Sequence, residues 1–236
     1  MTNIGIAFII RKRKCDILMD FRFDLIIEYF PYFLRGAAYT IGISLLGILF
    51  GLILGLFIGL GKMIKNRILA FPFTAYITFF RGTPLMLQIL IIHFGVVRAV
   101  LGETNGIVAG IVALSLNSAA YVAEIFRAGI QSLDKGQMEA ARSLGMNYVQ
   151  AMRHVILPQA FKRMIPPLGN EFIVLLKDSA QISIIAVPEL TYWARVFQGR
   201  YYKVWEPYLT AAIVYLILTM VLTFLLDRLE KRLKTE

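Results

Sequence analysis

The sequence has few of the residues that metal sites and disulfides require. It contains one cysteine, Cys15, and two histidines, His93 and His154, among 236 residues. A single cysteine excludes a disulfide within the chain and any cysteine-cluster metal site, and two histidines do not make a histidine-rich one. We therefore expect no metal site, and we find no nucleophile and base in an arrangement that suggests catalysis.

Charged residues are also scarce. Asp, Glu, Lys and Arg make up 17% of the chain, against about 25% in soluble domains, and hydrophobic residues make up 58%. This composition excludes a water-soluble enzyme and a disordered chain, because so many apolar side chains must face lipid. The net charge of +10 does not indicate nucleic acid, since most basic residues lie in short segments between apolar runs.

Long apolar runs predict the fold class, which is an all-α integral membrane protein. A helix crosses a hydrocarbon layer of about 30 Å with about 20 residues. Five stretches satisfy this length, although the fourth contains three charged residues and is the weakest. We place the five transmembrane helices at residues 36–61, 68–97, 104–126, 164–188 and 207–227.

The positions of the basic residues predict the orientation. Most Lys and Arg of the connecting segments follow the first, third and fifth spans, and few lie at 98–103 and 189–206. Cytoplasmic loops carry the excess of Lys and Arg. This bias puts residues 127–163 and the C-terminus in the cytoplasm, and an odd number of spans then puts the N-terminus outside.

The first 18 residues conflict with that orientation, because the basic run 11–14 would lie outside. The apolar segment before this run is too short to span, and a signal peptide would carry its basic residues before the apolar stretch. A protein that began at Met19 would have a more ordinary N-terminal sequence. We interpret residues 1–18 as an N-terminal extension or a mis-assigned start, and residues 19–236 as a single transmembrane domain.

Two local patterns surround the start of the first span. Residues 21–34 mix apolar and charged side chains, as an interfacial amphipathic helix does, and Pro31 is expected to limit the length of that helix. Within the span, small residues on one helix face allow a neighbouring helix to approach closely. Glycines recur there at every fourth residue, at positions Gly47, Gly51, Gly55 and Gly59.

The stretch at residues 127–163 is too polar to cross lipid and too rich in Ala, Leu and Met for a plain solvated loop. Asp134 is expected to cap a helix and Gly145 to end it. A second helix would begin at Asn147, and Pro158 would break or kink the chain. Two short helices joined at a glycine form a protruding knob, which suits docking into a groove on another protein. An ordinary connecting loop is the alternative.

The same stretch carries the residues of a known motif. Glu139-Ala140-Ala141 is followed by three residues, Gly145, nine further residues and Val155-Ile156-Leu157-Pro158. This pattern resembles the EAA loop of bacterial ABC-importer permeases, with Val155 in place of the usual isoleucine. Valine keeps a β-branched apolar side chain, so the difference is small.

Three further segments resemble the polar amino-acid branch of these permeases, at residues 81–85 (R-G-T-P-L), 117–124 and 176–179. The resemblance covers roughly residues 19–236. It implies a multi-pass permease subunit of an ATP-driven importer for polar or cationic amino acids in the bacterial inner membrane. The alternatives are a permease of the same type for another small polar solute, and an ATPase-independent channel or integral membrane enzyme.

The resemblance also implies partners. In such permeases the EAA loop forms coupling helices that seat in a cleft of a cytoplasmic ATPase dimer. No G-x-x-x-x-G-K-[ST] sequence is present, so we expect ATP and Mg²⁺ on the ATPase and no cofactor on this chain. The other implied partners are a second permease subunit, identical or homologous, and an extracytoplasmic amino-acid-binding protein. The implied coupling residues are Glu139, Ala140, Ala141, Arg142, Ser143, Leu144, Gly145 and Met146.

Polar residues inside the predicted spans are candidates for a substrate path. A charge at the centre of a membrane helix costs about 2.5–3.5 kcal/mol on insertion scales, so it faces a cavity or a partner. Asn117, Tyr121 and Glu124 share one helix face, and a free amino acid needs both an acceptor and donors. The predicted path residues are Arg81, Asn117, Ser118, Tyr121, Glu124, Lys177, Asp178 and Ser179.

Two of these residues have structural alternatives. Glu124 lies at the cytoplasmic end of its span, and instead of lining the substrate path it could pair with Arg127 or with another helix. Arg81 could form a structural ion pair with Glu171 or Asp178 instead of contacting substrate. It precedes a Gly-Thr-Pro triplet, which predicts a kink at Pro84.

Overall fold

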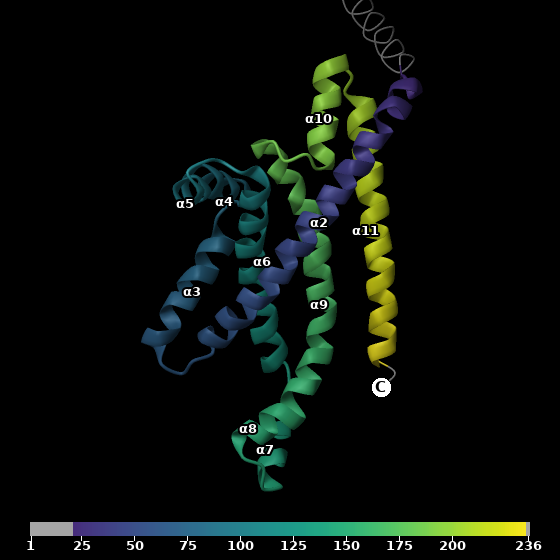
Figure 1. Cartoon of the computed structure of the whole chain (residues 1–236). Helices are drawn as coiled ribbons and strands as arrows, with labels where there is room; N and C mark the ends of the chain where they lie inside the picture. Colours follow the sequence, from purple (N-terminus) through teal and green to yellow (C-terminus); the bar gives the residue numbers. More distant parts are fainter. Residues whose placement is uncertain (1–20, 235–236) are drawn as a thin grey trace, which may run out of the picture.

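The computed structural model describes residues 21–234, and every regular element in that range is helical (Figure 1). The predicted extension, residues 1–18, lies outside the described residues. The all-α fold class is confirmed. The elements are α2 (Phe23–Lys62), α3 (Arg67–Gly82), α4 (Leu85–Ile91), the π-helix η1 (Ile92–Val97), α5 (Arg98–Leu101), α6 (Gly106–Gln131), α7 (Lys135–Ser143), α8 (Tyr148–Ala151), the π-helix η2 (Met152–Ile156), α9 (Leu157–Asp178), the 3-10 helix η3 (Ser179–Ile185), α10 (Leu190–Tyr201) and α11 (Trp205–Lys234).

Three of the described helices, α2, α6 and α11, are long and apolar enough to cross a membrane. The segments Arg67–Gly82 and Leu85–Leu101 count as a fourth span if they are taken together, with a bend of 109° between them. The predicted span at 164–188 does not pass this test. It corresponds to α9 and η3, and the charged residues of α9 lower its hydropathy. The predicted count of five spans is therefore not confirmed.

Helix α2 is continuous over 40 residues, so the prediction that Pro31 limits a separate interfacial helix was wrong. Proline removes one backbone hydrogen bond from a helix, but side-chain packing holds α2 together on both sides of it. Tyr29 and Phe33 are buried in a cluster with Leu190 and Phe197 of α10. The ring of Tyr29 stacks on that of Phe197 with their centroids 4.4 Å apart.

The glycines spaced by four in α2 face α6, as the sequence predicts. A Cβ atom added to Gly55 would lie 2.5 Å from Val122 Cγ1 and 2.9 Å from the Ala119 carbonyl oxygen. A Cβ atom on Gly59 would lie 2.9 Å from the carbonyl oxygen of Ala123. These backbones approach closely because the α2 residues lack side chains.

We expect Gly55→Ala to lower the thermal stability of the protein in detergent, because the new methyl group would collide with Val122 and the Ala119 carbonyl. Overpacking of this kind costs about 1–3 kcal/mol. Gly42→Ala is the matched control, since nothing lies within 4 Å of its added Cβ atom. Thermal melting of both variants beside the parent measures the effect. An unchanged melting temperature for Gly55→Ala would contradict the close packing.

The knob forms where the sequence predicts it. The Asp134 side chain caps α7 by accepting a hydrogen bond from the Gly136 amide at 2.9 Å. Gly145 follows α7 with a φ of +89°. Asn147 and Gln150 exchange hydrogen bonds of 2.9 Å between side chain and backbone at the start of α8, in a capping box. Local signals therefore set both helix starts and the turn between them.

The sequence predicts a break or a kink at Pro158, and the structure shows no break in the helix that follows the knob. The chain passes from α8 through η2 into α9 without leaving a helical path. Pro158 lies near the start of α9, directly after the π-helical segment η2. The π-helical segment before it adjusts the hydrogen-bond register, as such segments do within longer helices.

The knob, the turn between α2 and α3 and the C-terminal end of α11 lie toward one end of the molecule (Figure 1). Helix α10 and the start of α2 lie toward the opposite end. We call these the knob end and the α10 end. The segments that are rich in Lys and Arg thus gather at the knob end.

Candidate functional site

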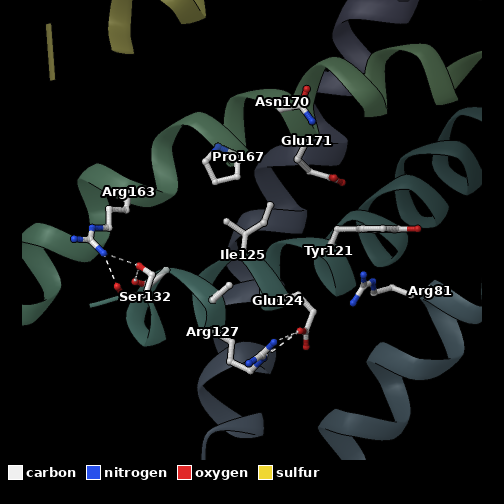
Figure 2. A pocket seen from close by; sticks show the side chains of 12 residues that line it. Arg81, Tyr121, Glu124, Ile125, Arg127, Ser132, Arg163, Pro167, Asn170 and Glu171 are labelled. Carbon is white, nitrogen blue, oxygen red and sulfur yellow. Dashed lines mark hydrogen bonds and ion pairs between the residues drawn. The ribbon is translucent and has the colours of Figure 1, made fainter. Parts of the chain in front are cut away.

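A cavity of about 550 Å³ lies between α3, α6 and α9, beside the part of α6 that leads to the knob (Figure 2). Its polar lining comes from three helices that are distant in sequence. The residues that line it are Arg81, Tyr121, Glu124, Ile125, Arg127, Ala128, Gly129, Ser132, Arg163, Pro167, Asn170 and Glu171. Both signs of charge therefore face one space, which suits a solute that carries both.

Glu124 lies in the cavity wall with both carboxylate oxygens occupied. Lys62, the last residue of α2, forms an ion pair with Oε1. The Arg127 guanidinium donates to Oε2 from Nη2 at 2.7 Å and from Nε at 3.1 Å. The structure thus shows the pairing with Arg127 that was the alternative for this residue, and it adds a link from α6 to α2.

Glu171 is the second carboxylate of the cavity, and it is only 8% exposed. Its Oε1 atom accepts a hydrogen bond from Ser118 Oγ at 3.0 Å. Within residues 21–234 it makes no ion pair. The predicted path omitted Glu171, although a carboxylate in an apolar stretch is the signal that would have found it.

Arg81 enters the cavity from the last turn of α3. Its Cζ atom lies 5.2 Å from the centroid of the Tyr121 ring, in cation–π geometry. Figure 2 shows its guanidinium pointing toward Tyr121 and Glu124 of α6. Among the described residues Arg81 forms no ion pair, either with Glu171 or with Asp178.

The other predicted path residues lie outside the lining of this cavity. Asn117 is buried, and its side-chain amide donates to Gln88 Oε1 at 2.9 Å. Ser118 supports Glu171 through the hydrogen bond described above. Residues 177–179 lie where α9 passes into η3. The structure therefore brings Arg81, Tyr121 and Glu124 together in the lining and leaves the remaining predicted residues outside it.

The knob presents the second candidate site. Ala141 is buried, whereas most of residues 139–146 are exposed, and the Leu144 side chain is 82% exposed at the tip. A hollow of about 240 Å³ is lined by Leu144, Gly145, Met146, Gln150 and His154. The exposed side chain of Leu144 thus borders a hollow on a polar projection.

The helices and the two sites define a polytopic membrane protein with a charged cavity and a projecting knob. Residues 47–235 match the model of one protein family, the binding-protein-dependent transport system inner membrane component. The chain belongs to this family, and it is a membrane component of a transport system rather than an enzyme.

The chain is similar to named transport proteins along most of its length. It is 40% identical to the arginine transport system permease protein ArtQ of Bacillus subtilis (strain 168), over 92% of this chain and 99% of that protein. It is 36% identical to the glutamine transport system permease protein GlnP of Escherichia coli (strain K12), with the same coverage of 92% and 99%.

Solved structures are similar as well. A crystal structure of an amino acid ABC transporter with histidines matches with a TM-score of 0.84 at 44% identity, covering 90% of this chain and 99% of that chain. An inward-facing structure of the MetNI methionine ABC transporter matches with a TM-score of 0.75 at 24% identity, covering 87% of this chain and 98% of that one. The second match shows a shared fold.

Proposed function

We propose that this chain is the permease subunit of an ATP-driven importer of polar or cationic amino acids. The family, the relatives named for arginine and glutamine, and the similar amino acid transporter structure all support this function. The observation that carries the proposal is the cavity, which is lined by Arg81 and by the carboxylate of Glu171. An amino acid zwitterion offers a carboxylate to the first and an ammonium group to the second.

The proposed substrate path follows from this arrangement. Arg81 and Tyr121 face the substrate, and Glu171 joins them as an acceptor that no cation of the described residues neutralises. Glu124 borders the path, although its oxygens are held by Lys62 and Arg127. We also propose contributions to the path from residues outside the cavity lining, namely Asn117, Ser118, Lys177, Asp178 and Ser179.

The knob is the proposed contact with the ATPase. Residues 139–146 carry the E-A-A segment and the glycine turn, and the exposed side chain of Leu144 lies at the tip. ATP and Mg²⁺ would bind the ATPase dimer. A second permease subunit would complete the membrane part, and an amino-acid-binding protein would meet the α10 end.

The proposed location is the bacterial inner membrane, with the N-terminus outside and the C-terminus in the cytoplasm. The gathering of basic segments and of the C-terminal end of α11 at the knob end supports this orientation (Figure 1).

Uptake of labelled arginine and glutamine tests the proposed function. The subunit is reconstituted in proteoliposomes with its ATPase and binding protein, and uptake is measured with and without ATP. We expect uptake of at least one of the two amino acids only when ATP is present. Flux without ATP would support the channel alternative. ATP-dependent uptake of a different solute alone would contradict the amino-acid assignment.

A further inference from the structure

The bend between α3 and α4 leaves a backbone carbonyl without its helical donor. Pro84 has no N–H group, so the carbonyl of Phe80, four residues earlier, loses the hydrogen bond that a helix would give it. The chain turns by 109° at this break, inside a segment that is apolar enough to span a membrane. An unpaired carbonyl in such a place is costly, since lipid offers no replacement donor.

The side chain of Gln88 in α4 supplies the missing donor. Its Nε2 atom lies 2.9 Å from the Phe80 carbonyl oxygen, 3.1 Å from that of Thr83 and 2.9 Å from Thr83 Oγ1. The Thr83 hydroxyl in turn donates to the Phe79 carbonyl at 2.9 Å. Gln88 is 3% exposed, so these bonds are shielded from water and hold the two arms of the bend together.

Helix α6 completes this arrangement. The side-chain amide of Asn117 donates to Gln88 Oε1 at 2.9 Å and lies 3.4 Å from the Phe80 carbonyl oxygen. The Tyr76 hydroxyl, one turn earlier in α3, donates to the Leu116 carbonyl at 2.7 Å. We call Gln88 and Asn117, with the Phe80 and Thr83 oxygens that they contact, the bend clamp. It fixes α3, α4 and α6 relative to one another.

The bend clamp is close in the chain to two residues that line the cavity. Arg81 follows Phe80 in the chain, and Tyr121 lies one helical turn after Asn117 on α6. The clamp therefore holds the backbone on both sides of the contact between Arg81 and Tyr121, whose Cζ-to-centroid distance is 5.2 Å. Gln88 is not among the residues that line the cavity.

We propose that Gln88 is a positioning residue of the translocation cavity. It replaces the backbone donor that Pro84 lacks, it ties the bend to Asn117, and it thereby sets where Arg81 enters the cavity. The link to transport rests on the proposed function, whereas the effect of Gln88 on the bend rests on the geometry alone.

A distance measurement tests the geometry. Gln88→Met keeps the length and burial of the side chain but removes its amide. In a Cys15→Ser background of the assembled transporter, spin labels replace the exposed Phe71 of α3 and Val100 of α5. We expect one narrow distance in the parent and a shifted or broadened distribution in Gln88→Met. An unchanged distribution would overturn the clamp.

Ser115→Ala is the matched control. It also removes a buried polar group from α6, but among the described residues the Ser115 hydroxyl donates only to the Ile111 carbonyl of its own helix, at 2.6 Å. We expect the parent distance in this variant. An equal shift in Ser115→Ala would mean that any polar loss in this region loosens the bend, and would count against a specific role for Gln88.

Arginine uptake tests the positioning role, with glutamine as the probe if the parent takes up only that. We expect Gln88→Met to raise the KM about tenfold, as the loss of one buried hydrogen bond would, with the ATPase still bound and Ser115→Ala near the parent value. A shifted bend with an unchanged KM would overturn the positioning role. If the parent takes up neither amino acid, the proposed function fails, whereas the distance measurement still decides the clamp.

Discussion

Gly145→Asp is expected to abolish ATP-dependent uptake and to weaken association with the ATPase. Gly145 has a φ of +89°, which residues with a side chain rarely adopt, although no atom of residues 21–234 lies within 4 Å of an added Cβ. The strain would therefore come from the backbone, and it would shift the tip that carries Leu144. Glu139→Lys reverses an exposed charge on the same knob and is expected to act in the same direction.

Uptake in proteoliposomes and co-purification of the ATPase measure both effects, and we expect at least a tenfold loss of each. Gly102→Asp is the matched control, because Gly102 has a φ of +78° with no atom within 4 Å of an added Cβ, but it follows α5. This variant should suffer similar strain and still bind the ATPase. Full transport by Gly145→Asp and Glu139→Lys, or equal ATPase loss in Gly102→Asp, would contradict the coupling role.

Glu124→Gln is expected to reduce uptake about tenfold or more while the ATPase stays bound. The change leaves Lys62 and Arg127 without their carboxylate, in the wall of a cavity that also holds Arg81. Breaking a fully buried ion pair costs about 3–5 kcal/mol. The cost here is smaller, since the Lys62 and Arg127 side chains are 25% and 31% exposed and water screens them.

A charge swap separates the two roles open to Glu124. The double variant Lys62→Glu, Glu124→Lys restores an ion pair between α2 and α6. Recovery of uptake would identify Glu124 as a link between helices. Normal assembly without recovery would mean that a carboxylate is required at position 124 itself, by Arg127 or by the substrate. Uptake of Glu124→Gln with the parent KM and maximal rate would remove Glu124 from both roles.

The features that the sequence predicts correctly depend on near neighbours. Asp134, Gly145 and Asn147 act within a few residues of their own positions, so the knob follows from local capping and turn chemistry. The same holds for the spacing of the glycines in α2, whose contact with α6 requires only that small residues share a face.

The features that were missed depend on distant partners. Pro31 was expected to end a helix, but α10 packs against α2 and overrides the local signal. The sequence offered Arg127 as a partner for Glu124, but it could not identify the second partner, Lys62, which comes from another helix. The environment of Gln88 exists only after α3 and α4 bend and α6 packs beside them. The fourth span stays a prediction, because α9 mixes apolar and charged residues and does not pass a test of length and hydropathy.

Crosslinking from the knob tests the central claim most directly. In a Cys15→Ser background, Ser143→Cys places a reactive thiol on the exposed part of α7, and Tyr202→Cys places one at the α10 end, where the side chain is 86% exposed. The account predicts that Ser143→Cys in native membranes crosslinks to the ATPase and Tyr202→Cys does not. If Ser143→Cys reacted only with lipid, or if both positions captured the ATPase equally, the knob would not be its docking surface.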